Sequence, residues 1–546
     1  MKLPALITAA CLAATGLVVV APGSAAVEPA ARAVQAVDWA RCDDRTLRQL
    51  GAKCGFVRVP LDYSRPRGAT IRLAVSRVKH TVKASRYQGV MLVNPGGPGG
   101  SGLGLSVLGP IISQDFGRKD AGGVYDWIGF DPRGVGDSRP SLSCDPGYFG
   151  PDRPEYIPST PELFQTWQAR SAGYAQACGK AGGRLLDHMR TTDAARDMNE
   201  IRKALGATRI NYYGFSYGTY LAQVYTKLFP NRMRRMVLDS NVDPRRVWYR
   251  ANLDQDVAFD RNIGLFFDWI ASHDAAYHLG ATRAAVQQRY TDVRAQLAAT
   301  PIDATVGPDE WDDIFLYAGY VQYLWPDLAD VFANWVNKAD GAPVVEAYQQ
   351  FDGPGDDNSY AVYNAVSCTD DTWKDEDFVA DQEATYAKAP FLTWANAWFN
   401  GPCYYWPAKA APHTRITGRG VGAALLVGET LDAATPYTGS LYLRSIFRNS
   451  RLIGVTGGTS HAVSPSGNRC VDKRIFDYLA TGKLPARKAG AGADVRCAAP
   501  PLPRPNSGQL STSSRSTSSS PSFADAAAGD SGRELVARLL LEAARR

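Results

Sequence analysis

Residues 209–239, RINYYGFSYGTYLAQVYTKLFPNRMRRMVLD, are the stretch that decides the fold. The stretch begins with a short apolar run, which is followed by two closely spaced glycines. A longer run of residues comes next, and a second apolar segment ends the stretch. This pattern predicts a strand at residues 209–213, a tight turn from Gly214 to Gly218, a helix at residues 219–229 and a strand at residues 233–238. Strand, turn, helix and strand in this order are typical of a parallel sheet covered by helices.

The same pattern of short apolar runs and helical segments extends in both directions along the chain. Upstream, a helix is expected at residues 194–205, with Thr192 as its cap and Gly206 as its stop. Further short apolar runs predict strands at residues 54–60, 70–78, 89–94, 127–130, 423–427 and 452–455. The sequence therefore predicts an α/β protein with a mostly parallel central sheet flanked by helices.

The predicted turn has the form GxSxG, with Ser216 between Gly214 and Gly218. Glycine on both sides lets the backbone turn sharply, so that the serine hydroxyl stands above the sheet. Between a predicted strand and a predicted helix, this motif indicates the nucleophile elbow of an α/β-hydrolase fold. We therefore predict Ser216 as a catalytic nucleophile.

A serine nucleophile needs a base, and the base needs a carboxylate that orients it. In this fold both follow the serine, each after a late strand. Asp432 follows the strand at residues 423–427, and His461 follows the next one in a glycine-rich loop. We predict Asp432 as the acid and His461 as the base. Glu429 is the competing acid, disfavoured because it comes almost directly off its strand. Surface or packing roles are expected for the other histidines: His80, His188, His273, His278 and His413.

A glycine-rich loop, NPGGPGGSG at residues 94–102, follows another predicted strand. It could cradle a phosphate, but no GK[ST] follows, and bare glycine backbone suits an oxyanion hole better. The N–H groups of Gly97 and Tyr217 are the candidate donors. The next strand ends in FDPRGVGDS at residues 130–138, which is expected to buttress the oxyanion loop rather than to take part in the chemistry.

The chain of 546 residues has room for one large domain with a sizeable insertion, or for two domains. Residues 1–26 have the charge, apolar run and small residues of a secretory signal, the alternative being a retained membrane anchor. Secretion to the extracellular medium is therefore expected. We divide the rest into a linker or short pro-segment at residues 27–36, a hydrolase core at 37–240 and 418–497, a mainly helical cap insertion rich in tryptophan and tyrosine at 241–417, and a Pro/Ser/Thr-rich tail at 498–546 that is expected to be disordered.

Eight cysteines remain after the signal, an even number that suggests disulfides in an exported chain. Pairing of sequential neighbours is expected, although sequence alone leaves the connectivity open. Metal binding is the rival interpretation, disfavoured because there is no CxxC or HExxH motif. The expected pairs are Cys42 with Cys54, Cys144 with Cys178, Cys368 with Cys403, and Cys470 with Cys497.

The charges are nearly balanced, with 60 Lys and Arg against 54 Asp and Glu. No long basic block is present, which argues against nucleic acid or an anionic membrane as a partner. No metal or organic cofactor is needed for the chemistry that the motifs indicate.

Together, the motifs NPGGPGGSG, GFDPRGVGDS, GFSYGTY and LDAATPY and the late His461 resemble the secreted bacterial tripeptidyl aminopeptidases, relatives of prolyl aminopeptidase. The resemblance covers residues 37–497, including cap segments at residues 248–259, 273–280, 365–370 and 393–398. It supports the same three catalytic residues. The tail departs from the family, and Ala462 follows His461 where relatives often have glycine.

The resemblance implies that tripeptides are released from the free N-terminus of peptides through an acyl-enzyme. A carboxylate in the cap would then bind the substrate's ammonium group, and the candidates are Asp370, Asp371, Asp243 and Glu429. A secreted carboxylesterase or acyltransferase is the alternative, because the same three residues cleave esters. An inactive binding relative is the third interpretation, disfavoured because the motifs are intact.

Overall fold

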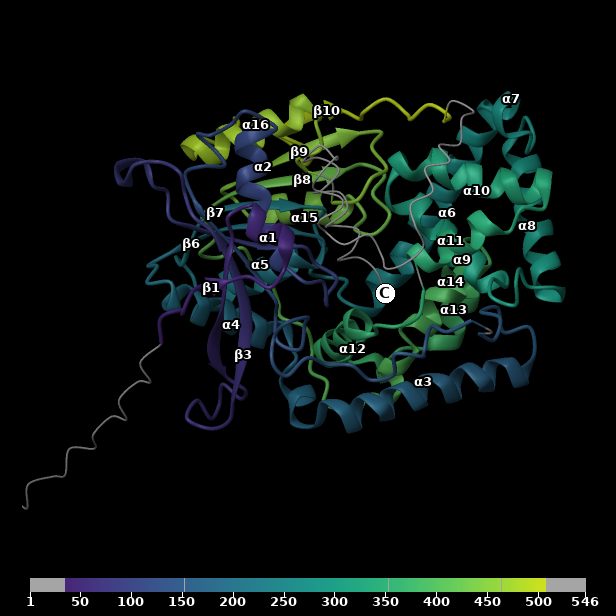
Figure 1. Ribbon diagram of the computed structural model, residues 1–546, viewed down its shortest axis with the longest axis horizontal. Helices are drawn as coiled ribbons and strands as arrows, with labels where there is room; N and C mark the ends of the chain where they lie inside the picture. Colours follow the sequence, from purple (N-terminus) through teal and green to yellow (C-terminus); the bar gives the residue numbers. More distant parts are fainter. Residues whose placement is uncertain (1–34, 152, 352, 463, 507–546) are drawn as a thin grey trace, which may run out of the picture. The chain divides into compact units, whose positions relative to one another are not determined.

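Ten strands form a single sheet in the computed structural model, which describes residues 35–506 except 152, 352 and 463 (Figure 1). The strand order is β1-β2-β3-β5-β4-β6-β7-β8-β9-β10. The first four strands in this order pair antiparallel, and all later neighbours pair parallel. The strands are β1 (Ala40–Arg41), β2 (Lys53–Pro60), β3 (Thr70–Val78), β4 (Val90–Asn94), β5 (Asp126–Phe130), β6 (Ile210–Phe215), β7 (Met233–Asp239), β8 (Ala423–Glu429), β9 (Ser450–Thr456) and β10 (Val495–Ala498).

The described residues all fall within one unit, Val34–Arg546. The signal predicted at residues 1–26, the linker up to residue 34 and the part of the predicted tail from residue 507 lie outside the described part of the chain. The predicted disorder of the tail is wrong for its first residues, 498–506. Ala498 ends β10, the Trp269 side chain donates to the Pro503 carbonyl at 3.0 Å, and the Asn506 amide donates to Asp327 and Asp330 at 2.9 and 2.7 Å. None of the described helices has both the length and the apolar character needed to cross a lipid bilayer.

Side chains of the central strands alternate between two apolar cores, as the period of two in a strand requires. In β4, Val90 and Leu92 join one core, while Met91 and Val93 join the other. Two helices, α2 (Leu108–Gln114) and α16 (Arg469–Thr481), contribute to the core with Met91. On the other side lie α4 (Thr191–Ala204), α5 (Tyr217–Leu228) and α15 (Thr438–Ile446). A short helix, α1 (Arg45–Gln49), follows β1.

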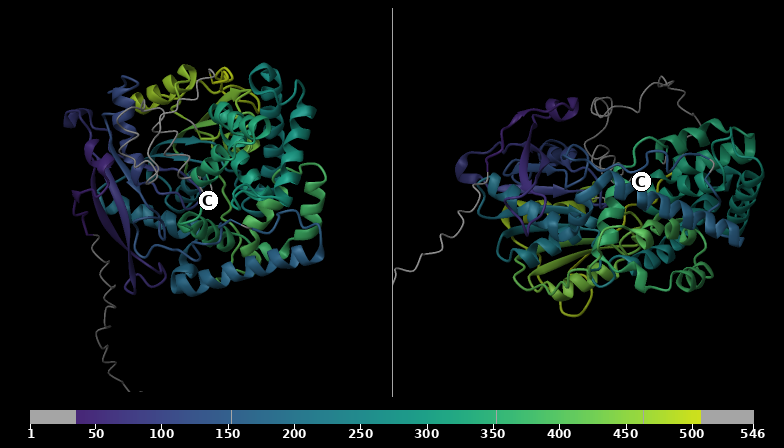
Figure 2. Two further views of the ribbon diagram at one scale, coloured as in Figure 1. Left: turned by 45° about the vertical axis from the view of Figure 1, so that its right-hand side comes forward. Right: turned by 90° about the horizontal axis from the view of Figure 1, so that it is seen from below.

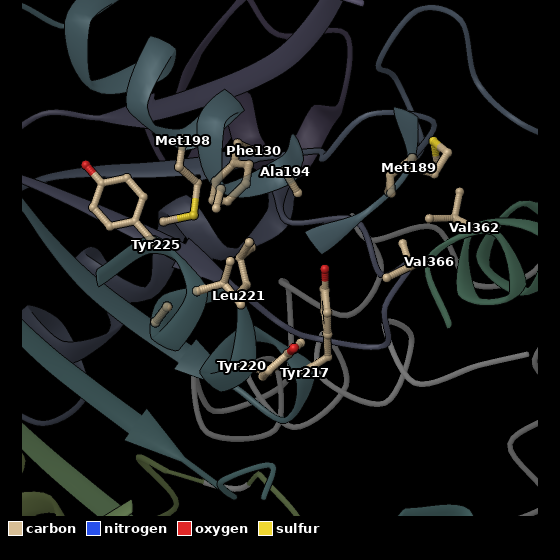
Figure 3. Packing of buried hydrophobic residues seen from close by; sticks show 14 of the residues in the cluster. Phe130, Met189, Ala194, Met198, Tyr217, Tyr220, Leu221, Tyr225, Val362 and Val366 are labelled. Carbon is tan, nitrogen blue, oxygen red and sulfur yellow. The ribbon is translucent and has the colours of Figure 1, made fainter. Parts of the chain in front are cut away.

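Figure 3 shows how α5 is packed in the first of these cores. Its side chains Leu221 and Tyr225 lie beside Met198 of α4, and Tyr217 lies at the end nearer Val366 (Figure 3). Thus the helix that follows the predicted nucleophile is held by a helix of the core and by a helix from a distant part of the sequence.

The elements predicted between residues 191 and 239 are confirmed, with two local differences. Helix α4 begins at Thr191, so Thr192 lies inside its first turn and the predicted cap is wrong. The residue before the helix, Arg190, makes no capping bond with its side chain. Instead the Asp370 carboxylate accepts the Thr191 N–H at 3.1 Å, so a distant residue satisfies an orphan donor that a local cap would have satisfied. In addition, helix α5 begins at Tyr217, two residues earlier than expected.

Between β7 and β8 the chain forms a mainly helical insertion with its own apolar core, which includes Phe266, Trp311 and Phe315. Figures 1 and 2 show these helices grouped apart from the strands. The helices are α6 (Tyr249–Ser272), α7 (Asp274–Tyr277), α8 (Arg283–Ala299), α9 (Pro308–Tyr320), α10 (Trp325–Lys338), α11 (Ala342–Phe351), α12 (Asn358–Asp370), α13 (Phe378–Tyr386) and α14 (Thr393–Phe399). Short 3-10 helices span Ala84–Arg86, Leu103–Val107, Gly183–His188, Gln322–Leu324, Trp373–Asp375 and Gly401–Tyr405.

One long helix of the first half, α3 (Pro161–Gly182), packs against this insertion. Trp167 of α3 stacks on Trp398 of α14 with ring centroids 5.7 Å apart. Just before α3, Arg153 pairs with Glu310 and Asp313 of α9 at 3.0 and 2.8 Å. Residues that precede position 241 therefore already pack against the insertion. The predicted domain boundary at residue 241 stays a prediction.

Four disulfides join the cysteine pairs expected from their order in the sequence. They link Cys42 to Cys54, Cys144 to Cys178, Cys368 to Cys403, and Cys470 to Cys497. The third bridge connects α12 to the 3-10 helix Gly401–Tyr405 inside the insertion.

Candidate active site

Ser216 occupies a strained turn between β6 and α5. Its φ and ψ are 52° and −126°, a conformation that side-chain-bearing residues adopt rarely and that marks functional turns. The flanking glycines are required by close contacts. A Cβ on Gly214 would lie 2.8 Å from the Gly218 carbonyl oxygen, and one on Gly218 would lie 2.7 Å from that of Asn94. The sharp backbone turn that the sequence predicts is thus made at Ser216 itself.

The predicted acid and base are in direct contact. Nδ1 of His461 lies 3.0 Å from each carboxylate oxygen of Asp432, and both side chains are buried. Thr435 orients the acid, because its N–H donates to Oδ1 at 3.0 Å and its hydroxyl donates to Oδ2 at 2.9 Å. With Nδ1–H donated to the carboxylate, Nε2 of the imidazole is free to accept a proton.

Glu429, the competing acid, makes no hydrogen bond with the His461 side chain in the described structure. Its Oε2 accepts the N–H of Ser460 at 2.6 Å. Burial, reinforced by the neighbouring carboxylates of Asp432 and Asp239, raises the pKa of Glu429 to about 8. Glu429 therefore supports the loop before His461, whereas Asp432 contacts the base.

The two expected oxyanion donors come from two different segments, Gly97 from the loop after β4 and Tyr217 from the start of α5. Gly97 has a φ of 101°, which favours glycine, and Tyr217 is the first residue of α5. Within the described residues no hydrogen bond occupies either N–H. As expected, Asp131 supports the glycine-rich loop, because its Oδ1 accepts the Ser101 hydroxyl at 2.6 Å and the Gly102 N–H at 3.0 Å.

One pocket brings these groups together. It is lined by Ser216, His461, Gly97 and Tyr217 from the core of the fold. The insertion supplies further lining residues, among them Asn252, Phe259, Leu316, Tyr320, Ser359, Tyr363 and Asn396. The site is therefore built at the carboxyl ends of the parallel strands, with walls from the inserted helices.

Among the four carboxylates predicted to bind a substrate ammonium group, only Asp243 lines this pocket, and Arg245 binds it with a contact of 2.9 Å. The other three carboxylates do not line the pocket, and each accepts backbone N–H groups elsewhere. Asp370 accepts that of Thr191, Asp371 that of Trp248 at 2.7 Å, and Glu429 that of Ser460. Burial raises the pKa of Asp370 to about 6.

Two residues of the site were not singled out from the sequence. Asp254 lines the pocket and receives two bonds of 2.6 Å from Arg246. It lies in the cap segment 248–259, whose resemblance to the peptidases was the available signal. Thr435 lies three residues after Asp432, within the motif that carries the acid, but only the fold shows that its hydroxyl faces the carboxylate.

Comparison with known proteins agrees with this geometry. The family model for the alpha/beta hydrolase fold matches residues 89–462. The tripeptidyl aminopeptidase of Streptomyces lividans is 42% identical over 487 residues, which cover 87% of this chain and 89% of that protein. Serine protease Hip1 of Mycobacterium tuberculosis is 30% identical over 489 residues, covering 83% and 90% of the two chains. Carboxylesterase B of the same organism is 30% identical over 479 residues, covering 82% and 86%. The chain therefore belongs to the α/β-hydrolase family, in the group that contains the Streptomyces tripeptidyl aminopeptidases.

Proposed function

We propose that this protein is a secreted serine exopeptidase that releases tripeptides from the free N-terminus of peptides. The observation that carries the proposal is the pair of 3.0 Å contacts between His461 Nδ1 and Asp432, in a pocket that Ser216 also lines. The 42% identity to a protein named tripeptidyl aminopeptidase supports the choice of a peptidase among serine hydrolases.

The proposed reaction is acyl transfer in two steps. Nε2 of His461 takes the Ser216 hydroxyl proton as the serine oxygen attacks the carbonyl carbon of the third residue. The N–H groups of Gly97 and Tyr217 bind the resulting oxyanion. His461 then gives its proton to the departing amine. Water, activated by the same imidazole, hydrolyses the ester and frees the tripeptide, while Asp432 stabilises the imidazolium in both steps.

Recognition of a free N-terminus requires an anionic group at the far end of the pocket. Asp243 and Asp254 line the pocket, and each is also held by an arginine. A carboxylate has about four lone-pair sites. Asp254 uses two of them on Arg246 and can bind a substrate ammonium while keeping its arginine. Asp243 accepts four contacts from Arg245 and must give up at least one of them to do so. We assign this role to these two residues in place of Asp370, Asp371 and Glu429. The helical wall of the pocket would then limit how many residues fit before the scissile bond.

Export is part of the proposal. The predicted signal at residues 1–26 would direct it, and four disulfides are compatible with an oxidising environment outside the cytosol.

The proposal is tested with one chromogenic tripeptide amide, its N-acetylated twin and a short acyl ester. A free-amine substrate that is cleaved at least 100-fold faster than the blocked one would support an aminopeptidase. The Ser216→Ala variant, assayed in parallel, measures any hydrolysis that does not depend on the serine. Equal cleavage of the free and blocked amides would contradict the exopeptidase assignment.

A carboxylesterase or acyltransferase is the second candidate. It is favoured by the 30% identity to carboxylesterase B, and by the fact that the same catalytic residues cleave esters. Activity on the ester together with none on either amide would select it.

A further inference from the structure

Helix α6 of the insertion contacts both loops that carry the proposed acid and base. The contact is made by Asn262, whose side chain is fully buried. Its Nδ2 lies 3.0 Å from the Leu431 carbonyl oxygen, next to the acid, and 3.5 Å from the Thr459 carbonyl oxygen, two residues before the base. A third carbonyl, of Gly319 at the end of α9, lies 3.2 Å away.

The orientation of this amide is set by its neighbour. Nε of Arg261 donates to Oδ1 of Asn262 at 2.9 Å, so the oxygen faces the guanidinium and the NH₂ group faces the three carbonyls. Another nitrogen of the same guanidinium donates to the Leu431 carbonyl at 2.6 Å. Both residues thus hold the peptide group that precedes Asp432.

The same part of the insertion also holds the base. The backbone N–H of His461 donates to the carbonyl oxygen of Tyr320 at 2.8 Å. Tyr320 is the residue after Gly319. Beyond it, the N–H of Gln322 lies 3.3 Å from the Ser460 hydroxyl oxygen. The Asn262 amide therefore lies where α6, the end of α9 and the two catalytic loops meet.

We propose that Asn262 is a positioning residue, which sets the distance between Asp432 and His461 by hydrogen-bonding the backbone of both loops. It does not line the pocket, so it touches neither the substrate nor the reacting atoms. Through Asn262 the insertion becomes a structural part of the catalytic machinery as well as a wall of the pocket. This inference rests on the proposed roles of Asp432 and His461.

The test compares Asn262→Asp with a matched control. Aspartate has the same shape but places an acceptor against three carbonyl oxygens. The control is Asn364→Asp in α12, another fully buried asparagine of the insertion, whose Nδ2 donates to the Tyr360 carbonyl of its own helix at 3.1 Å. Each purified protein is assayed on the short ester and on the tripeptide amide. kcat, KM and the pH dependence of kcat/KM are recorded, and near-ultraviolet circular dichroism monitors the fold.

We expect Asn262→Asp to lower kcat on both substrates about 10- to 100-fold, because a misplacement near 1 Å costs a rate of this order. KM should change less than twofold, and the apparent pKa of the base in the pH profile should move by about half a unit or more. Asn364→Asp should keep kcat within about threefold. Equal losses of kcat in the two variants, or an unshifted pH profile in Asn262→Asp, would overturn the proposal.

A second variant keeps the test decisive if Asn262→Asp does not fold. Arg261→Lys changes an exposed residue and keeps the positive charge, but loses the forked contact with Asn262 and Leu431. It should lower kcat about 3- to 10-fold without changing KM, and an unchanged kcat would overturn the proposal. Failure of the proposed function is seen separately. If the wild type cleaves only the ester, the peptidase assignment fails, while the ester kinetics of these variants still decide the role of Asn262.

Discussion

The buried carboxyl of Glu429 makes the free energy of unfolding of this protein depend on pH, and both the sign and the size of this dependence follow from its raised pKa. The side chain is 6% exposed, and burial raises its pKa from 4.5 to about 8. Glu429→Gln removes the titrating group and keeps an oxygen that accepts the Ser460 N–H. The variant and the wild type should therefore be alike at pH 5 and differ at pH 8.

The sign follows from proton binding. Between pH 5 and pH 8 the folded protein keeps the proton on Glu429 while the unfolded chain has lost it, so the free energy of unfolding falls as the pH rises. Each pK unit corresponds to about 1.4 kcal/mol, which amounts to roughly 3–4 kcal/mol over this range. Other buried acids contribute equally to both proteins and cancel in the difference. For a chain of this length 1 kcal/mol corresponds to about 1 °C, so the variant should gain about 3 °C in Tm relative to wild type between pH 5 and pH 8.

The assay is thermal unfolding at pH 5 and pH 8, followed by circular dichroism at one scan rate. Glu383→Gln, at an exposed glutamate, controls for the removal of a surface charge. A difference in Tm between Glu429→Gln and wild type that is the same at both pH values would refute the reasoning. Because Asp432 contacts His461, the variant should also keep kcat at pH 7 within about threefold, and a loss of 1,000-fold or more would restore Glu429 as the acid.

Three further predictions concern the site itself. Ser216→Ala should lower kcat/KM about 10⁵-fold or more on every substrate while leaving Tm nearly unchanged, and retention of 1% activity on amide or ester would contradict its role as nucleophile. Thr435→Val keeps the shape of the side chain but removes the 2.9 Å hydrogen bond to Asp432 Oδ2, so kcat on the ester should fall about tenfold or more. An unchanged kcat would show that the bond from the Thr435 backbone N–H is enough to orient Asp432. Gly96→Ala places a Cβ 2.8 Å from both the Phe215 carbonyl oxygen and Ser216 Cβ, at a residue whose φ is 111°, and should abolish activity or folding. Gly355→Ala is the control, because that residue has a φ of 138° but open space around it. This variant should retain activity and show only the cost of the strained backbone.

The strands and the elbow could be predicted because they depend on local patterns. The strand at residues 70–78 agrees with β3 at both ends, since an apolar run between turn residues marks a strand within its own sequence. The start of α4 could not be predicted, because Asp370 caps it from 179 positions away along the chain. Similarly, α3 lies in the first half of the sequence, but its tryptophan stacks on α14 of the insertion.

The sequence by itself determined the fold class and the sharp turn at Ser216, because these features follow short-range rules of turn and strand formation, and it predicted the candidate acid and base from their places after the late strands. Only the tertiary structure decided which carboxylates reach the pocket. Asp370 and Asp243 are the same residue type and both accept backbone N–H groups, yet of the two only Asp243 lines the pocket. It also placed the Asn262 amide against the two loops that carry the proposed acid and base. The physical reason is that a side chain's partners are set by burial and by contacts across the fold, and neither leaves a periodic signal in the sequence.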